Sequence, residues 1–203
     1  MTMTSKRPDR VIRADQVPGP RQGDWTYSHY AALPEDGQRY EIVDGVLYMA
    51  PSPTGEHQDT AGRFYHYLLM LVEFVGLGKV RLAPFDVRLD ERTVVQPDVM
   101  VILKASLSKL HKTYVLGAPD LVIEIASPKT ASYDRHEKQD DYALAGVPEY
   151  WIVDTNSRTI EVLSLEQGVY HSLGVFTRAQ TLRSLVVPQI GTIQAEQFFP
   201  PAE

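Results

Sequence analysis

The chain has 203 residues, of which 43% are hydrophobic and 23% are charged, and its formal net charge is −6. These values suit one globular domain with a real core. The negative net charge argues against a surface that is basic overall and binds nucleic acid in general. It is compatible with a local basic cleft. The absence of cysteine excludes disulfides, thiolate zinc sites and cysteine catalysis.

No apolar run approaches the ~20 residues that a membrane-spanning helix needs. The first residues also lack the apolar core of a secretion signal. We therefore expect a cytoplasmic protein that makes no membrane contact. Residues 1–23 are polar and rich in proline and glycine, which predicts a flexible tail. Residues 24–203 are then expected to form a single domain.

The first part of this domain predicts two helices and a hairpin. Residues 25–33 indicate a short helix. Asp44-Gly45 lies between two apolar runs, which is typical of a two-residue hairpin turn. Apolar residues then recur at three- and four-residue steps between residues 57 and 75, and this spacing predicts an amphipathic helix.

The rest of the chain alternates strand and helix patterns. A helical turn is expected near residues 107–112, and a second amphipathic helix at residues 132–145. Strands are expected at residues 79–90, 93–103, 120–126, 149–154, 159–165, 169–172 and 182–187. This order predicts an α/β fold with one central mixed sheet flanked by helices.

Two carboxylates stand in otherwise apolar strand segments. Asp98 follows Pro97 at the head of a Val-Met-Val-Ile run, and Glu124 lies within Asp120–Ala126. Strand alternation places Glu124 and Ala126 on one face, and carboxylates are rarely buried without a partner or a metal. Their oxygens would suit Mg²⁺ or Mn²⁺. The alternatives are a turn cap at Asp98 and a core arginine paired with Glu124.

A lysine in the second amphipathic helix is a further candidate for this site. Asp134, Lys138 and Tyr142 lie at four-residue steps, which places them on one line of the helix. That face also carries apolar contacts, so Lys138 is expected to point inward, beside Ala126, where it would bind phosphate or position water. Otherwise it is a surface lysine paired with Asp134. Lys129 is a second candidate for phosphate binding.

Two further residues complete the candidate site. Glu41 lies in the first hairpin, where the alternative is a solvent-facing strand residue. His57 begins the first long helix, a favourable place for contact with phosphate or metal; the alternative is an exposed residue of the first helical turn.

Together, in their order, several stretches resemble the Uma2 family (DUF820) of the PD-(D/E)xK restriction-endonuclease-like superfamily. The matching stretches are Tyr40-Glu-Ile-Val-Asp-Gly, Pro51-Ser-Pro with His57, Gln96-Pro-Asp, Leu121 to Pro128, Asp134 to Lys138, Tyr142, and Ala145 to Asp154. The resemblance implies a central mixed sheet with an added N-terminal hairpin and C-terminal strands. It also implies metal-dependent hydrolysis of DNA phosphodiester bonds.

Carried over by residue, the resemblance assigns Glu41, Asp98 and Glu124 to the acidic, metal-binding positions. The chain departs from the family pattern at Ala126, where a lysine is expected, and Lys138 fits a lysine that has migrated to the following helix. The competing hypotheses are a binding module that cuts nothing and a nucleotide phosphohydrolase. A homodimer is left open.

Overall fold

The computed structural model describes residues 11–126 and 138–201. Its strands form two mixed six-stranded sheets within these ranges. The N-terminal sheet has the order β1-β3-β2-β6-β5-β8, and the central sheet has the order β12-β11-β10-β9-β7-β4. The strands of the N-terminal sheet are β1 (Ile12–Arg13), β2 (Arg39–Val43), β3 (Val46–Ala50), β5 (Asp86–Arg88), β6 (Val94–Val95) and β8 (Tyr114–Leu116). Those of the central sheet are β4 (Gly78–Leu82), β7 (Val99–Leu103), β9 (Leu121–Ala126), β10 (Glu149–Asp154), β11 (Thr159–Glu166) and β12 (Val169–Thr177).

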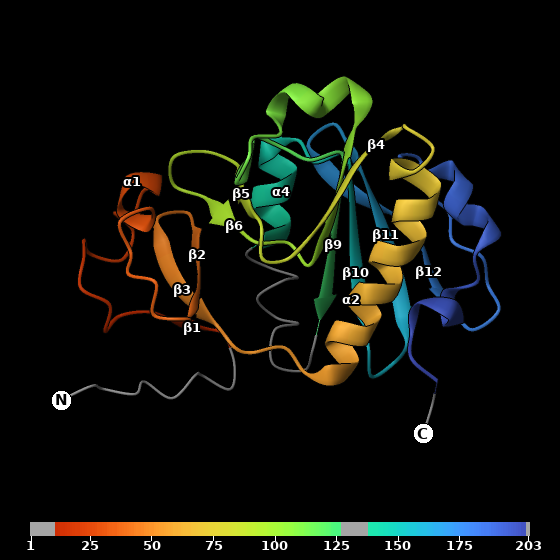
Figure 1. Cartoon of the computed structure of the whole chain (residues 1–203), viewed down its shortest axis with the longest axis horizontal. Coiled ribbons are helices and arrows are strands. Elements are labelled where there is room, and N and C mark those ends of the chain that lie inside the picture. Colours follow the sequence, from red (N-terminus) through yellow and green to blue (C-terminus); the bar gives the residue numbers. More distant parts are fainter. Residues whose placement is uncertain (1–10, 127–137, 202–203) are drawn as a thin grey trace.

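Helices cover both faces of the central sheet (Figure 1). In the described ranges they are α1 (Tyr27–Tyr30), α2 (Gly55–Leu68) with its π-helical extension η1 (Leu69–Glu73), α4 (Gln139–Ala145) and the 3₁₀ segments η2 (Lys104–Lys109), η4 (Pro188–Thr192) and η5 (Ala195–Phe198). Phe64 and Leu68 of α2 pack on one face together with residues of the C-terminal segment. Tyr142 of α4 and several valines of the N-terminal sheet pack on the other. The central sheet is therefore the middle layer of the molecule.

The predicted hairpin is confirmed as β2 and β3. Asp44 and Gly45 have φ angles of 45° and 75°, the left-handed values that a two-residue turn of this kind requires. The helix predicted at residues 57–75 is also confirmed, although it begins at Gly55, and Thr54 accepts a hydrogen bond from the backbone N–H of His57.

The two long strands predicted at residues 79–90 and 93–103 are each divided between the sheets. β4 and β7 pair in the central sheet, whereas β5 and β6 pair in the N-terminal sheet. Pro84 and Pro97 lie at the breaks, where a residue without an N–H cannot continue a strand ladder. Each of these two segments therefore contributes one strand to the central sheet and one strand to the N-terminal sheet.

Three other expectations need correction or completion. Residues 12 and 13 pair with β3 as strand β1, so this part of the expected tail is a strand in the structure. Residues 182–187 form no strand, because backbone N–H groups there bind the Glu149 carboxylate instead of a neighbouring strand. The first part of the helix predicted at residues 132–145 lies outside the described residues. Among the described helices, none has the length and apolar character needed to cross a membrane.

Candidate active site

The site lies at one end of β9, where three carboxylates from separate segments come together. Glu124 lies on β9, and it shares a face with Val122 and Ala126 that packs against Tyr142 of α4. Alternation along the strand therefore predicts the direction of Glu124 correctly. Asp98 precedes β7, and because Val99 pairs with Ile123, the next position along this antiparallel pair sets Asp98 opposite Glu124.

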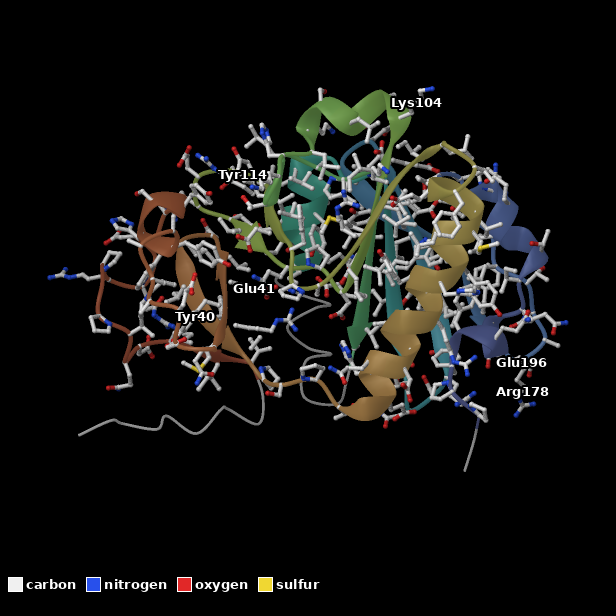
Figure 2. All side chains as sticks on the ribbon, in the orientation of Figure 1. Tyr40, Glu41, Lys104, Tyr114, Arg178 and Glu196 are labelled. Carbon is white, nitrogen blue, oxygen red and sulfur yellow. The ribbon has the colours of Figure 1, made fainter. Side chains whose placement is uncertain are left out.

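Glu41 reaches this site from the N-terminal sheet. It lies on β2, where that sheet meets the rest of the molecule (Figure 2). Only 3% of Glu41 is exposed, and its Oε1 accepts the backbone N–H of Gln96 at 2.8 Å. A solvent-facing role for Glu41 is thereby excluded.

Lys138 joins the two glutamates. Its Nζ donates to Oε1 of Glu41 and to Oε1 of Glu124, each at 3.0 Å. Only 4% of Lys138 is exposed, so it is an inward-facing residue, and its ammonium lies on the face of β9 that also carries Ala126. Tyr142, one helical turn further, donates its hydroxyl to the same oxygen of Glu124 at 2.7 Å. The four-residue spacing of Lys138 and Tyr142 therefore places both side chains on Glu124.

Asp98 is held by a different set of donors. Its Oδ2 accepts the backbone N–H of Ile125 at 2.8 Å and lies 3.0 Å from Nε2 of His57. Thr54 caps the helix that presents His57, and the hydrogen bond to Asp98 holds the imidazole beside the carboxylate. Asp98 is therefore a cross-strand bridge instead of a turn cap, and His57 is half-buried against it.

Burial and neighbouring charge set the ionisation of these groups. Burial raises the pKa of Glu124 to about 7; Asp98 and Glu41 add to the rise, whereas Lys138 and the Tyr142 hydroxyl oppose it. Burial also disfavours charge on Asp98 and His57. The hydrogen bond and charge that these two groups supply to each other oppose burial. With further help from Arg39 and the Ile125 N–H, the pKa of Asp98 falls below its usual value, and with help from Glu124 the pKa of His57 rises above its usual value.

Among the described residues, no group of three His, Cys, Asp or Glu side chains is placed to hold a metal ion. The site nevertheless contains carboxylate oxygens that are open to a ligand. The hydrogen bonds that the described residues make to Glu41, Asp98 and Glu124 all fall on one oxygen of each carboxylate. The second oxygens, Oδ1 of Asp98 and Oε2 of both glutamates, receive none from the described part of the chain. Carboxylate oxygens of this kind suit Mg²⁺ or Mn²⁺.

Two residues of the site carry a weaker sequence signal. Gln96 belongs to the Gln-Pro-Asp stretch, and its side-chain amide links Asp86 and Tyr30 while its backbone holds Glu41. Arg39 donates from Nε and Nη2 to the side-chain and backbone oxygens of Gln96, each at 3.3 Å. Arg39 immediately precedes the Tyr40-Glu41 motif, yet no periodicity singles it out. The remaining candidate, Lys129, lies outside the described residues.

A central mixed sheet between helices, with acidic residues gathered at one end of its strands, defines the restriction-endonuclease-like class. The comparisons place the chain within it. Residues 27–195 match the family described as "Uma2: Putative restriction endonuclease", and the chain belongs to this family.

The solved structures that match include one described as "a putative nuclease belonging to DUF820" from Anabaena variabilis. Its TM-score is 0.72 and its identity is 20%, over 86% of this chain and 97% of that chain. At this identity the likeness shows the fold. No curated protein matches the chain. The family description indicates a restriction endonuclease, and the structural neighbour supports the fold.

Proposed function

We propose that the protein is a metal-dependent endonuclease that hydrolyses phosphodiester bonds in DNA. The observation that carries this proposal is the convergence of Glu41, Asp98, Glu124 and Lys138 from four separate segments at one end of the central sheet. A buried cluster of three carboxylates and one ammonium is not needed for stability, because apolar residues of similar size are often as stabilising at such positions.

Asp98 and Glu124, with Glu41, would hold Mg²⁺ or Mn²⁺. When bound, the cation supplies positive charge for the phosphoryl and leaving oxygens. Lys138 orients the attacking water and the scissile phosphate through its N–H donors, and the two glutamates hold its ammonium in place. His57, hydrogen-bonded to Asp98, contacts the substrate phosphate from the start of α2, and Lys129 is a second phosphate contact.

One feature favours the alternative of a binding module that cuts nothing. The Lys138 ammonium already bridges Glu41 and Glu124, so these two carboxylates have a cation without any metal. A module of this kind would bind nucleic acid or protein at the same site and would need neither Mg²⁺ nor Mn²⁺.

The test compares Asp98→Asn with wild-type protein on plasmid, linear duplex, single-stranded DNA and free nucleotides. Incubations with Mg²⁺, Mn²⁺ and EDTA run in parallel. Because the substitution removes a charge aimed at the reaction centre, we expect cleavage to fall at least ~100-fold. Asp120→Asn is the matched control, because Asp120 lies at the opposite end of β9 and binds Leu103 and Ser106.

Equal cleavage by wild type and Asp98→Asn would show that Asp98 has no part in catalysis. Hydrolysis of nucleotides alone would favour a nucleotide phosphohydrolase. DNA binding without cleavage under any metal condition would favour the binding module.

A further inference from the structure

A hollow of about 250 Å³ opens beside the carboxylate of Asp98. We name it the Asp98 hollow. It is built where β2, the start of α2, and the segment that links β4 to β5 approach the head of β7. Its lining includes Arg39, His57, Ala61, Leu82, Pro84 and Asp98. The candidate catalytic carboxylate thus forms part of its wall.

The two sides of the Asp98 hollow differ in chemistry. Asp98, His57 and Arg39, with Gln58, are its polar lining residues, which we call the polar side, whereas Leu82, Pro84 and Ala61 are apolar lining residues, which we call the apolar wall. Leu82 is 38% exposed, which leaves a large apolar side chain open toward the hollow. A site of this kind, apolar with a few polar groups at one side, is typical of a site for a small planar or compact ligand group.

Arg39 gives the polar side its positive charge. Its Nε and Nη2 are held by Gln96, while its Nη1 makes no hydrogen bond to any residue in the described ranges. A guanidinium carries five N–H donors in a fixed plane, which suits phosphate oxygens. Its charge also acts on both Asp98 and His57, so a phosphate on Arg39 would lie close to the proposed reaction centre.

We propose that the Asp98 hollow takes one unpaired nucleotide of the DNA substrate, with its base against Leu82, Pro84 and Ala61 and its phosphate on Arg39. This inference rests on the proposed nuclease function and specifies its substrate class. A base that is paired and stacked in a duplex cannot present its face to this wall. An unpaired base, from a single strand or a bulge, avoids the unstacking cost of a few kcal/mol.

The first experiment measures binding without cleavage. Thymidine 5′-monophosphate and deoxyribose 5-phosphate are titrated calorimetrically in EDTA, so that only the base distinguishes the ligands. We expect thymidine 5′-monophosphate to bind at least ~5-fold more tightly, which corresponds to burial of about 40 Å² of apolar surface of the base against the wall. Equal affinities would overturn the proposal.

Two variants locate this preference. Ala61→Phe fills the hollow, and Leu82→Ala removes part of its wall at a more exposed position that tolerates substitution. Both are expected to abolish the preference for the nucleotide. Leu144→Ala, at a leucine on α4 that is 85% exposed, is the matched control and should keep it. Retention of the preference in a folded Ala61→Phe protein and in Leu82→Ala would also overturn the proposal.

The second experiment separates this inference from the nuclease proposal. With Mg²⁺ or Mn²⁺, single strands and duplexes with a one-nucleotide bulge should be cut faster than fully paired duplex, and Ala61→Phe should cut the first two more slowly. If Ala61→Phe cleaves every substrate at the wild-type rate, the proposed role of the hollow is overturned, but the nuclease proposal stays intact. A base-dependent binding preference without any cleavage would support the hollow and contradict the nuclease proposal.

Discussion

At the scale of single residues, the site depends on one ammonium group. Lys138 is almost fully buried, and its Nζ lies 3.0 Å from a carboxylate oxygen of Glu41 and from one of Glu124. Removing one partner from a buried ion pair leaves charge without compensation, which destabilises a fold more than the intact pair stabilises it. Lys138 therefore has a structural consequence that can be measured apart from activity.

We expect Lys138→Met to lower the free energy of unfolding by about 3–5 kcal/mol at neutral pH, because Glu41 and Glu124 lose their shared cation. Urea denaturation measures this difference. Lys104→Met is the control, because Lys104 is exposed on η2 and surface substitutions usually change stability by less than about 0.5 kcal/mol. Similar unfolding free energies for the two variants would contradict the bridging role of Lys138.

At the scale of elements, local signals were predictable and pairings between distant segments were not. Asp44-Gly45 defines its turn through the backbone angles it permits, and the apolar stripe of α2 defines a helix face; both signals lie within a few residues. The inward direction of Lys138 followed from helical spacing in the same way. The partner of Asp98 did not, because His57 is 41 residues away and no local pattern records that contact.

Four acidic side chains meet where the β2–β3 turn, the β5–β6 loop and α4 approach one another. Burial raises the pKa of Asp141 from 3.8 to about 6, and the charges of Asp44, Asp90 and Asp140 add to the rise against a hydrogen bond from Thr93. The folded protein therefore holds this proton more tightly than the unfolded chain does. The resulting contribution to stability is present below the usual pKa and is lost as the pH rises through about 6.

Asp141→Asn should accordingly be more stable than wild type at pH 7.5, and the difference should shrink toward zero near pH ~4, where both side chains are neutral. Thermal unfolding at a series of pH values measures this. Asp59→Asn, at an exposed position of α2, makes the same change in net charge elsewhere. If both variants shift the midpoint alike at every pH, net charge and not the local cluster is responsible.

At the scale of the whole molecule, the site exists because two sheets pack together. Val43, Val87 and Val95 of the N-terminal sheet share one apolar cluster with Met100 and Val122 of the central sheet. This packing between the two sheets places Glu41 beside Lys138. The sequence indicated one sheet with an added hairpin, because alternation within a strand records which residues are buried and not which sheet they join.

The C-terminal segment shows the same limit, and a single buried carboxylate fixes its position. Glu149 is fully buried, and it accepts hydrogen bonds from Trp151 Nε1, from Ser184 Oγ and from the backbone N–H groups of Leu185 and Val186. A conservative substitution, Glu149→Gln, replaces an oxygen by an NH₂ group that faces these donors. Since a buried donor without an acceptor costs about 1–3 kcal/mol, we expect a loss of stability of at least this size.

The same substitution should also act locally, and this separates a clamp from general destabilisation. In Glu149→Gln, the hydrogen exchange of the backbone amides of residues 185 and 186 should become faster than in wild type. The exchange of amides in the central strands should change less, because the segment opens before the sheet unfolds. Glu166→Gln, at the exposed end of β11, is the matched control and should leave this exchange unchanged. Uniformly faster exchange throughout the chain would mean that Glu149 supports the core as a whole and does not hold this segment in particular.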